Sequence, residues 1–591
     1  MSALASLVRA YERLASNGDV PAYGYSQEKI GFLISLNAEG TPAGPPIDLR
    51  EGEGKKRLAK LIAVPQPVKR TSGIMPNFLW DKTAYLLGIT ATASKRTVDE
   101  HAAFVAAHRE RLADTDDEGL LALRHFLDAW KPDDFSRLGW PDDMRDQNIV
   151  FALESERRQD IRLHDRPAAR QLWARLASEG ERVESVCLAT GTRGPITRLH
   201  PSIKGVWGAQ TAGASIVSFN LDAFTSYGHQ QGENAPISEP AAFAYTTVLN
   251  RFLARGSRHR IQIGDASTVF WAEAEIAETA HDAEDIFASF FAIDEEQETG
   301  KIADTLKAIQ EGVPLEDVAP KLSKGVRFFV LALAPNAARL SVRFYVEDDF
   351  GAIAERYGKH AQRMKIEPAP RDATPSMWRL LIETATQKKS ENIVPNLAGD
   401  WMRAILTGAP YPLTLLSTLL MRLRADHDVN GLRAAIIKAV LIRNFGHSFA
   451  REIPVALDPD NREPGYLLGR LFAVYEQIQI AALGQNLNAT IKDKFYGAAA
   501  SQPRKVFPSL DKASRSHLSK LGKDRKGYQV VLERTIGEIM ETMSPGDDPF
   551  PPHLPDKQQG LFALGYYHQR NSFFSRPSGK SAEHVTEENN A

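Results

Sequence analysis

The hydrophobic periodicity of the chain changes once, at a proline-rich segment, and this change constrains the fold more than any other feature. The segment IEPAPRDATPS, residues 366–376, holds three prolines in eleven residues and is expected to be extended. Before it, helical spacing is interrupted by short runs rich in Val, Ile and Phe, which are typical of strands. After it, almost every pattern is helical. The sequence therefore predicts an α+β body over residues 1–365, a linker over 366–376 and an α-helical bundle over 377–575.

A strand–turn–strand unit is expected near the start of the chain. Alternate residues from Ile30 to Leu36 are apolar, and the turn residues 37–40 would let residues 47–49 pair back. Further strands are expected over residues 182–189, 214–220, 262–272, 327–333 and 337–346. In the last run Leu340, Val342, Phe344 and Val346 would share one face, and Arg339 and Arg343 the other. Helices are expected over residues 100–130 and 163–180.

The second part of the chain predicts a helical bundle. Its expected helices are residues 378–386, 412–424, 432–445, 466–483 and 527–543. The helix over 466–483 shows one apolar stripe, as a bundle helix requires. The polar end, residues 576–591, is expected to be disordered.

Composition indicates a folded protein of several domains. The chain has 591 residues, 43% of them hydrophobic and 25% charged, which is ordinary for packed proteins. Its single cysteine, Cys187, permits no internal disulfide and fits a reducing cytoplasm. The first 18 residues are typical of an amphipathic helix and not of a secretory signal, and no apolar run is long enough for a membrane span. We therefore expect a cytoplasmic protein that makes no membrane contact.

Charge is distributed unevenly although its sum is only -2. Six Lys or Arg and no acids lie between Lys55 and Arg70, and ten Lys or Arg against three acids lie between Lys492 and Lys526. Ten acids and no Lys or Arg lie between Glu273 and Glu298. Basic faces of this kind would meet a polyanion; the alternative is a set of solvated helix faces.

Motifs for catalysis are weak. GAQTAGAS, residues 208–215, has the glycine spacing of a phosphate loop but lacks its lysine. The dipeptides His164-Asp165, His281-Asp282 and His427-Asp428 do not by themselves establish a metal site. Cys187 lies in an apolar run and is expected to be an inert thiol. We expect no enzyme activity, no cofactor and no metal.

Two segments have the composition of recognition loops. The first is VPQPVKRTSGIMPNFLWDKTAYLLG, residues 64–88, in which basic residues precede a glycine turn and aromatic side chains. The second is residues 205–234, in which amide side chains alternate with glycines and aromatics. Amides can pair with base edges, glycines permit close backbone approach and aromatics can stack on bases. The alternative is a polar loop satisfied by its own backbone.

The chain resembles the large subunit of the type I-C CRISPR Cascade, an RNA-guided surveillance complex of bacteria. The resemblance covers essentially the whole chain. It is carried by the first recognition segment and, in the same order, by HPSIKGVWGAQTAGASIVSFNLDAFTSYGHQQGENAPIS (200–238), GDASTVFWAE (264–273), LALAPNAARLSVRFY (331–345) and QQGLFALGYYHQRN (558–571).

This resemblance implies a subunit without nuclease activity that serves antiviral defence. Such a subunit recognises the protospacer-adjacent motif in double-stranded DNA, promotes R-loop formation and docks the helicase-nuclease. Its other partners would be the 5′ handle of the CRISPR RNA, the handle-binding and backbone subunits, and the small subunit. Residues 455–575 resemble the small-subunit-like region, which this family can also make separately from an internal translation start.

Site residues follow as expectations from the resemblance. Lys69 and Arg70 would neutralise phosphates, Thr71, Ser72 and Gly73 would let the backbone approach the duplex, and Asn77 would touch a base edge. The competing reader of the motif is the second segment, with Gly208, Gln210, Ser218, Asn220, Gln230 and Asn234. Nucleic-acid backbone or single-strand contacts are expected from Arg339, Arg343, Lys492, Lys494, Arg504, Lys505, Lys512, Arg515, Lys523 and Arg525. Two other functions remain open: a structural scaffold that contacts CRISPR RNA and other subunits, or a metal-dependent nuclease that uses the His-Asp pairs.

Overall fold

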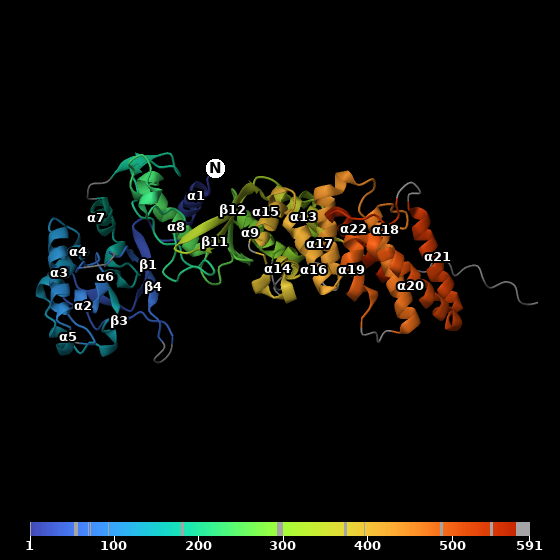
Figure 1. The fold of residues 1–591 in the computed structure, drawn as a ribbon. Helices are drawn as coiled ribbons and strands as arrows, with labels where there is room; N and C mark the ends of the chain where they lie inside the picture. The colour runs from blue at the N-terminus through green and yellow to red at the C-terminus, as the bar shows by residue number, and fades with distance from the viewer. Residues whose placement is uncertain are drawn as a thin grey trace, which may run out of the picture. The chain divides into compact units, whose positions relative to one another are not determined.

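The computed structural model describes residues 2–52, 57–68, 70, 73–92, 94–178, 183–291, 300–370, 375–394, 396–484, 489–543 and 548–574 (Figure 1). Its contacts form two compact units: unit 1 comprises Met1–Pro201 and Val217–Val248, and unit 2 comprises Ser202–Ile216 and Leu249–Ala591. A mixed α/β first part and a helical last part confirm the predicted α+β class.

Unit 1 is built on a four-stranded sheet whose order is β3-β2-β6-β5. Its main elements are α1 (Ala3–Ser16), β1 (Tyr25–Ile30), β2 (Phe32–Leu36), β3 (Ile47–Asp48), β4 (Lys60–Pro65), β5 (Asp81–Lys82), α2 (Thr83–Leu86), α3 (Arg96–Arg111), α4 (Glu118–Ala129), α5 (Asp134–Arg137), β6 (Asn148–Leu153), α6 (Glu154–Arg157), α7 (Pro167–Ser178), β7 (Glu184–Val186) and β8 (Arg193–Pro195). The predicted strand–turn–strand unit is confirmed, because β2 and β3 pair antiparallel with Leu33 opposite Ile47. Strand β2 is buried on both faces, and it also pairs in parallel with β6.

Two predictions for the first part of the chain need correction. The helix expected over residues 100–130 is two helices, α3 and α4, because the Asp117 side chain accepts from the Leu120 N–H and starts a new helix. The strand expected over residues 214–220 does not form. Only isolated bridges occur there, between Ala214 and Ile203 and between Ser215 and Arg339. The glycines on either side favour turns over a strand.

Unit 2 begins with an antiparallel sheet whose order is β12-β11-β10-β9. The boundary near residue 248 falls within α8 (Glu239–Phe252), and the elements that follow are β9 (Arg260–Ile263), β10 (Ala266–Glu273), α9 (Ala277–Phe290), α10 (Lys301–Glu311), α11 (Leu315–Val318), α12 (Pro320–Ser323), β11 (Arg327–Asn336), β12 (Arg339–Asp349) and α13 (Phe350–Met364). The run expected as one strand over 262–272 is therefore a hairpin that turns at Gly264, whose φ is 58°.

The single apolar face expected on β12 is interrupted. Leu340, Phe344 and Val346 are buried, but Val342 is 46% exposed. The register of β11 and β12 shifts so that Ala332 faces Phe344 while Leu333 faces Val342. A β-bulge of this kind breaks the alternation on which the sequence prediction depended.

The helical part of unit 2 confirms most of the predicted helices and adds others. Its helices are α14 (Met377–Ile382), α15 (Leu397–Thr407), α16 (Leu413–Asp426), α17 (Gly431–Phe445), α18 (Pro464–Leu483), α19 (Ile491–Ser501), α20 (Pro503–Asp524), α21 (Lys526–Thr542) and α22 (Asp556–Ser572). Helix α18 is not amphipathic as expected. It is buried all round between Gly465 and Glu476, because it is the central helix of the group.

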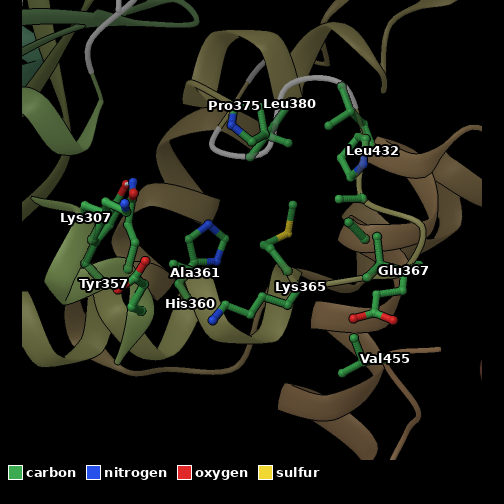
Figure 2. Close-up of a pocket in the computed structure, with 17 residues that line it drawn as sticks. Lys307, Tyr357, His360, Ala361, Lys365, Glu367, Pro375, Leu380, Leu432 and Val455 are labelled. Atoms are coloured by element: carbon green, nitrogen blue, oxygen red, sulfur yellow. Dashed lines mark hydrogen bonds between the residues drawn. The ribbon is translucent and has the colours of Figure 1, made fainter. Parts of the chain in front are cut away.

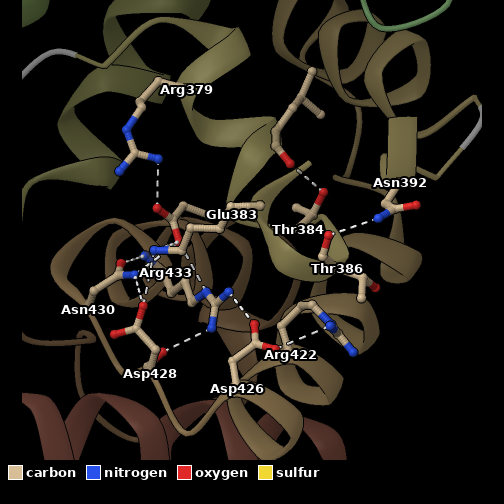
Figure 3. Close-up of polar contacts among 12 residues, drawn as sticks. Arg379, Glu383, Thr384, Thr386, Asn392, Arg422, Asp426, Asp428, Asn430 and Arg433 are labelled. Carbon is tan, nitrogen blue, oxygen red and sulfur yellow. Dashed lines mark hydrogen bonds and ion pairs between the residues drawn. The ribbon is translucent and has the colours of Figure 1, made fainter. Parts of the chain in front are cut away.

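A buried charge cluster joins α14, α16 and α17 (Figure 3). The Glu383 carboxylate and the Arg433 guanidinium are both fully buried and lie 3.2 Å apart. Arg379 donates to Glu383 at 2.7 Å, and Arg433 also donates to Asp426 at 2.6 Å. Burial raises the pKa of Glu383, but hydrogen bonds from Asn430 and Arg379 and the nearby charge of Lys388 hold it below its usual value.

The predicted linker does not coincide with a boundary between the two units, and the domain limits proposed from the sequence stay a prediction. Residues on both sides of it share one hydrophobic core, from Phe328 in the sheet to Leu432 in the bundle. The described ends of the linker line a cavity of about 460 Å³ together with Tyr357, His360 and Leu432 (Figure 2). Among the helices that the structure describes, none combines the length and apolarity that a transmembrane span requires.

Candidate nucleic-acid interface

The first recognition segment forms a turn that is organised around one buried carboxylate. The side chain of Asp81 is 1% exposed; it pairs with Arg70 and accepts from the Asn77 N–H at 2.9 Å. Burial raises the pKa of Asp81, and the hydrogen bonds from Arg70 and Asn77 offset part of this effect. The Arg70 guanidinium also lies 4.1 Å from the centroid of the Tyr85 ring. Arg70 is thus fixed by partners within the protein.

Asn77 has a structural role in the same turn. It is 4% exposed, and its Oδ1 accepts from the Val68 N–H at 3.1 Å. The Asn77 side chain is therefore held inside the turn. Gly73 is exposed with φ 86°, and its carbonyl accepts from Arg96 at 2.8 Å. Lys69, Thr71 and Ser72 lie outside the described residues.

The aromatic residues behind the turn are core residues. Phe78 stacks on Trp173 with ring centroids 5.5 Å apart. Trp80 donates its indole N–H to the Pro65 carbonyl at 2.8 Å. His108 accepts the Leu79 N–H at 3.0 Å through Nε2, and burial lowers its pKa to about 3. The turn is therefore anchored by the hydrophobic core of unit 1.

In unit 1 the second recognition segment forms a loop closed by Asn234. The Asn234 Oδ1 accepts from the Ser226 N–H at 2.9 Å, and its Nδ2 donates to the carbonyls of His229 and Gln231 at 3.2 and 3.0 Å. We call residues 226–234 the clipped loop. Its base lies against residue 197, because a Cβ on Gly232 would stand 2.0 Å from the Thr197 carbonyl. Asn234 is saturated by these bonds and thus shapes the loop.

The clipped loop exposes two other side chains. Tyr227 is 98% exposed and has φ 51°, a left-handed conformation that is uncommon outside glycine. Gln230 is also exposed. The sequence reasoning named Gln230 but missed Tyr227, which its place between Ser226 and Gly228 in a turn could have indicated. Of the other candidates in unit 1, Ser218 is half-buried and Asn220 is exposed.

Gly208 and Gln210 belong to unit 2, whereas the clipped loop belongs to unit 1. Gly208 has φ 75°, and the Gln210 carbonyl accepts from the Gly213 N–H at 2.9 Å in a tight turn. The Gln210 side chain is exposed. The two arginines of β12 are half-buried, and Arg343 forms an ion pair of 2.5 Å with Asp265.

The basic run of the C-terminal part forms α19 and α20 (Figure 1). Three of its arginines have partners within the protein: Arg504 pairs with Asp548, Arg515 pairs with Asp511, and Arg525 donates to the Ala481 carbonyl. On α19, Lys494 is exposed and Lys492 is half-buried.

The lysines of α20 form a continuous surface. At 3.6 residues per turn, an arc of about 80° contains the four exposed lysines and two exposed serines. We call this set the lysine stripe: Lys505, Ser509, Lys512, Ser516, Lys520 and Lys523. The opposite face, with Phe507, Leu510 and Leu518, is buried. None of the four lysines forms an ion pair within the part of the chain that the structure describes.

Metal ligands are not gathered in the described ranges. No three His, Cys, Asp or Glu side chains there lie together as metal ligands would. His164, 3.9 Å from Asp165, is fully buried, and His281 contacts Arg258. The described part of the acidic run is partly structural, because Glu284 accepts from the Ala272 N–H at 3.0 Å and from Arg258 at 3.1 Å.

Comparison with known proteins relates the chain to a family. The family model described as CRISPR-associated protein (Cas_Csd1) matches residues 7–574, which include the turn, the clipped loop and the lysine stripe. A search of curated proteins found no match.

Proposed function

Because the chain belongs to the Cas_Csd1 family of CRISPR-associated proteins, we propose that it is the non-catalytic large subunit of a type I-C Cascade. In this function it binds double-stranded DNA, reads the protospacer-adjacent motif, promotes R-loop formation and docks the helicase-nuclease. The guide RNA reads the remaining target sequence by base pairing. The partners are the CRISPR RNA handle, the subunits that hold it and the small subunit.

The observation that carries the proposal is the lysine stripe. Lys505 and Lys523 are 18 residues apart, so the stripe is about 27 Å long at 1.5 Å per residue. Lysines without carboxylate partners are free to neutralise phosphates, and the interleaved serines can donate to phosphate oxygens. The stripe therefore fits a nucleic-acid backbone, such as the strand displaced from an opened duplex.

The clipped loop supports motif reading. Gln230 presents an amide that can pair with a base edge, and Tyr227 presents a ring that can stack on a base or wedge between bases. Asn234 holds both in place through its bonds to the loop backbone.

The stripe is tested by the salt dependence of single-strand binding to the full chain. A variant with the four stripe lysines changed to Gln should bind a labelled single strand more weakly and lower the slope of log K against log salt by roughly 3, at about 0.7 per lost contact. The matched control changes four exposed lysines elsewhere in unit 2 to Gln: Lys307, Lys321, Lys324 and Lys389. Equal slopes for both variants would refute a role of the stripe.

Motif reading is tested in the assembled complex with duplexes that differ only at the motif. Gln230→Ala should reduce discrimination between motifs while leaving the fold intact. Asn234→Ala should lose discrimination and also increase protease cleavage within residues 226–234. If Gln230→Ala discriminates like the wild type and Gln210→Ala does not, motif reading belongs to unit 2.

A further inference from the structure

Trp207 borders a hollow on the surface of unit 2. We propose that this hollow binds one nucleotide of a single-stranded nucleic acid, with the base stacked on Trp207 and the phosphate on Arg255 and Arg260. This inference rests on the proposed function and adds a base-binding site to it. The hollow has a volume of about 420 Å³, and its side chains include Ser257 and Gln262. This volume is within the usual range of small-ligand sites.

The Trp207 ring is available, but its backbone is fixed. The side chain is 66% exposed. The Trp207 N–H donates at 3.0 Å to the hydroxyl of Ser267, which is fully buried and itself donates to Gln262 at 2.9 Å. Gly205 lets the loop lie against the end of α8, since a Cβ there would stand 2.6 Å from the Leu253 carbonyl. A ring on a rigid backbone loses little entropy when a base stacks on it.

The charges around the hollow suit an anion. Arg260 is half-buried and donates to the Leu253 carbonyl at 3.1 Å, and Arg255 is exposed. The hollow has no acidic side chain, and within the described ranges neither arginine forms an ion pair. Burial lowers the pKa of Arg260. A phosphate would supply the missing charge in the geometry that guanidinium groups prefer.

The combination distinguishes this hollow from an ordinary exposed aromatic residue. Single exposed apolar side chains are common and need no ligand. Here the ring lies beside two guanidinium groups that form no ion pair within the described ranges, while Gln262, bonded to Gly264 and Ser267, helps to fix the wall of the hollow. The lysine stripe offers contacts to phosphates, so the hollow supplies what the stripe lacks, which is contact with the base.

The test compares strands with and without bases. The full chain is titrated at fixed salt with a labelled oligothymidylate, an oligouridylate and an abasic strand of the same length. Trp207→Ala should weaken binding of a base-bearing strand by roughly fivefold to 150-fold, as expected for lost stacking, and leave the abasic strand unchanged. Trp207→Phe should retain most of the affinity. Arg255→Gln/Arg260→Gln should weaken all three strands, whereas Arg251→Gln, an exposed charge outside the hollow, should not.

Each outcome is decisive. A loss confined to oligothymidylate or to oligouridylate supports the site and identifies its ligand as DNA or RNA. Unchanged affinity of Trp207→Ala for both, with weaker binding of the stripe variant, overturns the hollow and leaves the proposed function standing. If the stripe variant is unchanged as well, the proposed function also fails. Should Trp207→Ala not fold, Trp207→Leu keeps the bulk without the aromatic face and must show the same loss.

Discussion

Asp81 fixes the conformation of the basic turn of unit 1. Its carboxylate holds both Arg70 and the backbone of Asn77, so the turn keeps one conformation without a ligand. Phosphate contacts from this turn would therefore begin from a preorganised backbone, with Arg70 as a support for its neighbours.

We expect Asp81→Asn to loosen the turn. The change removes a charged acceptor, so the Asn77 amide should exchange with solvent roughly 10- to 150-fold faster, which corresponds to a hydrogen bond of about 1.5–3 kcal/mol. Hydrogen exchange of that amide measures the effect. Asp114→Asn, at an exposed residue of the same unit, serves as the control. Equal protection in both variants would mean that Asp81 does not organise the turn.

Glu383 in the helical part is, like Asp81, a buried carboxylate that binds several partners. We expect Glu383→Gln to lower the free energy of unfolding by about 1.5–3 kcal/mol, because Arg433 would lose a fully buried charged partner while keeping Asp426. Denaturant unfolding followed by circular dichroism measures this loss. Glu391→Gln, at an exposed residue, should change the midpoint little, and a similar midpoint for both variants would argue against the cluster as a stabilising unit.

The sequence identified polar side chains that suit nucleic acid, but the fold determines which of them are available to bind it. Arg70, Asn77 and Asn234 were chosen from the sequence because their groups suit nucleic acid, and all three are bound within the protein. Tyr227 and Trp207 were not named as candidates, although they are exposed. Availability depends on which groups the turn brings together, such as Asp81 eleven residues after Arg70, and composition does not reveal these pairings.

Helices α18 and α22 contact each other through glycines. A Cβ on Gly469 would stand 2.1 Å from the Phe562 carbonyl, and a Cβ on Gly565 would stand 2.1 Å from the Tyr466 carbonyl. The two backbones therefore touch directly, and neither glycine leaves room for a larger residue.

We expect Gly469→Ala to lower the free energy of unfolding by about 1–3 kcal/mol, because the added methyl group forces the helices apart. Gly537→Ala in α21 is the control. Its Cβ meets no atom within 4 Å, so it should raise stability by about 0.5–1 kcal/mol through helix propensity. Thermal unfolding of the two variants should show opposite shifts. Shifts of the same sign would contradict the proposed backbone contact.

Element types were predictable where the periodicity was strong, as in α16, α17 and α21. Helix α20 was not predicted, although Phe507, Leu510 and Leu518 mark its buried face. The many basic residues between them led us to interpret this segment by its charge and not by its periodicity. The β-bulge at Val342 could not be predicted, since it depends on the register of a partner strand.

At the scale of the whole molecule, the described histidines limit the pH range of stability. Burial lowers the pKa to about 3 for two of them and to about 4 for four others: His108, His360, His164, His200, His259 and His568. These imidazoles stay neutral in the folded chain, whereas the unfolded chain binds protons below about pH 6.5.

We therefore expect stability to fall as the pH decreases from about 6.5 toward 4, by up to about 1.4 kcal/mol per pH unit for each histidine. The midpoint of thermal unfolding, measured at constant ionic strength, should decrease over this range. His447→Gln, at an exposed histidine, should leave the slope unchanged. A midpoint independent of pH between about 7.5 and 5 would contradict the lowered pKa values.

Helices α18 and α22, which contact each other through glycines, are synthesised at different times. Residues 484–555, which number 72, separate the two helices in the chain. At roughly 5–20 residues per second, synthesis of α18 is complete about 4–14 s before the first residue of α22 is made. During that interval a helix that ends up buried on all sides lacks its closest partner. A chaperone that binds the C-terminal part of the chain during this interval would cover apolar surface of α18 that α22 later buries.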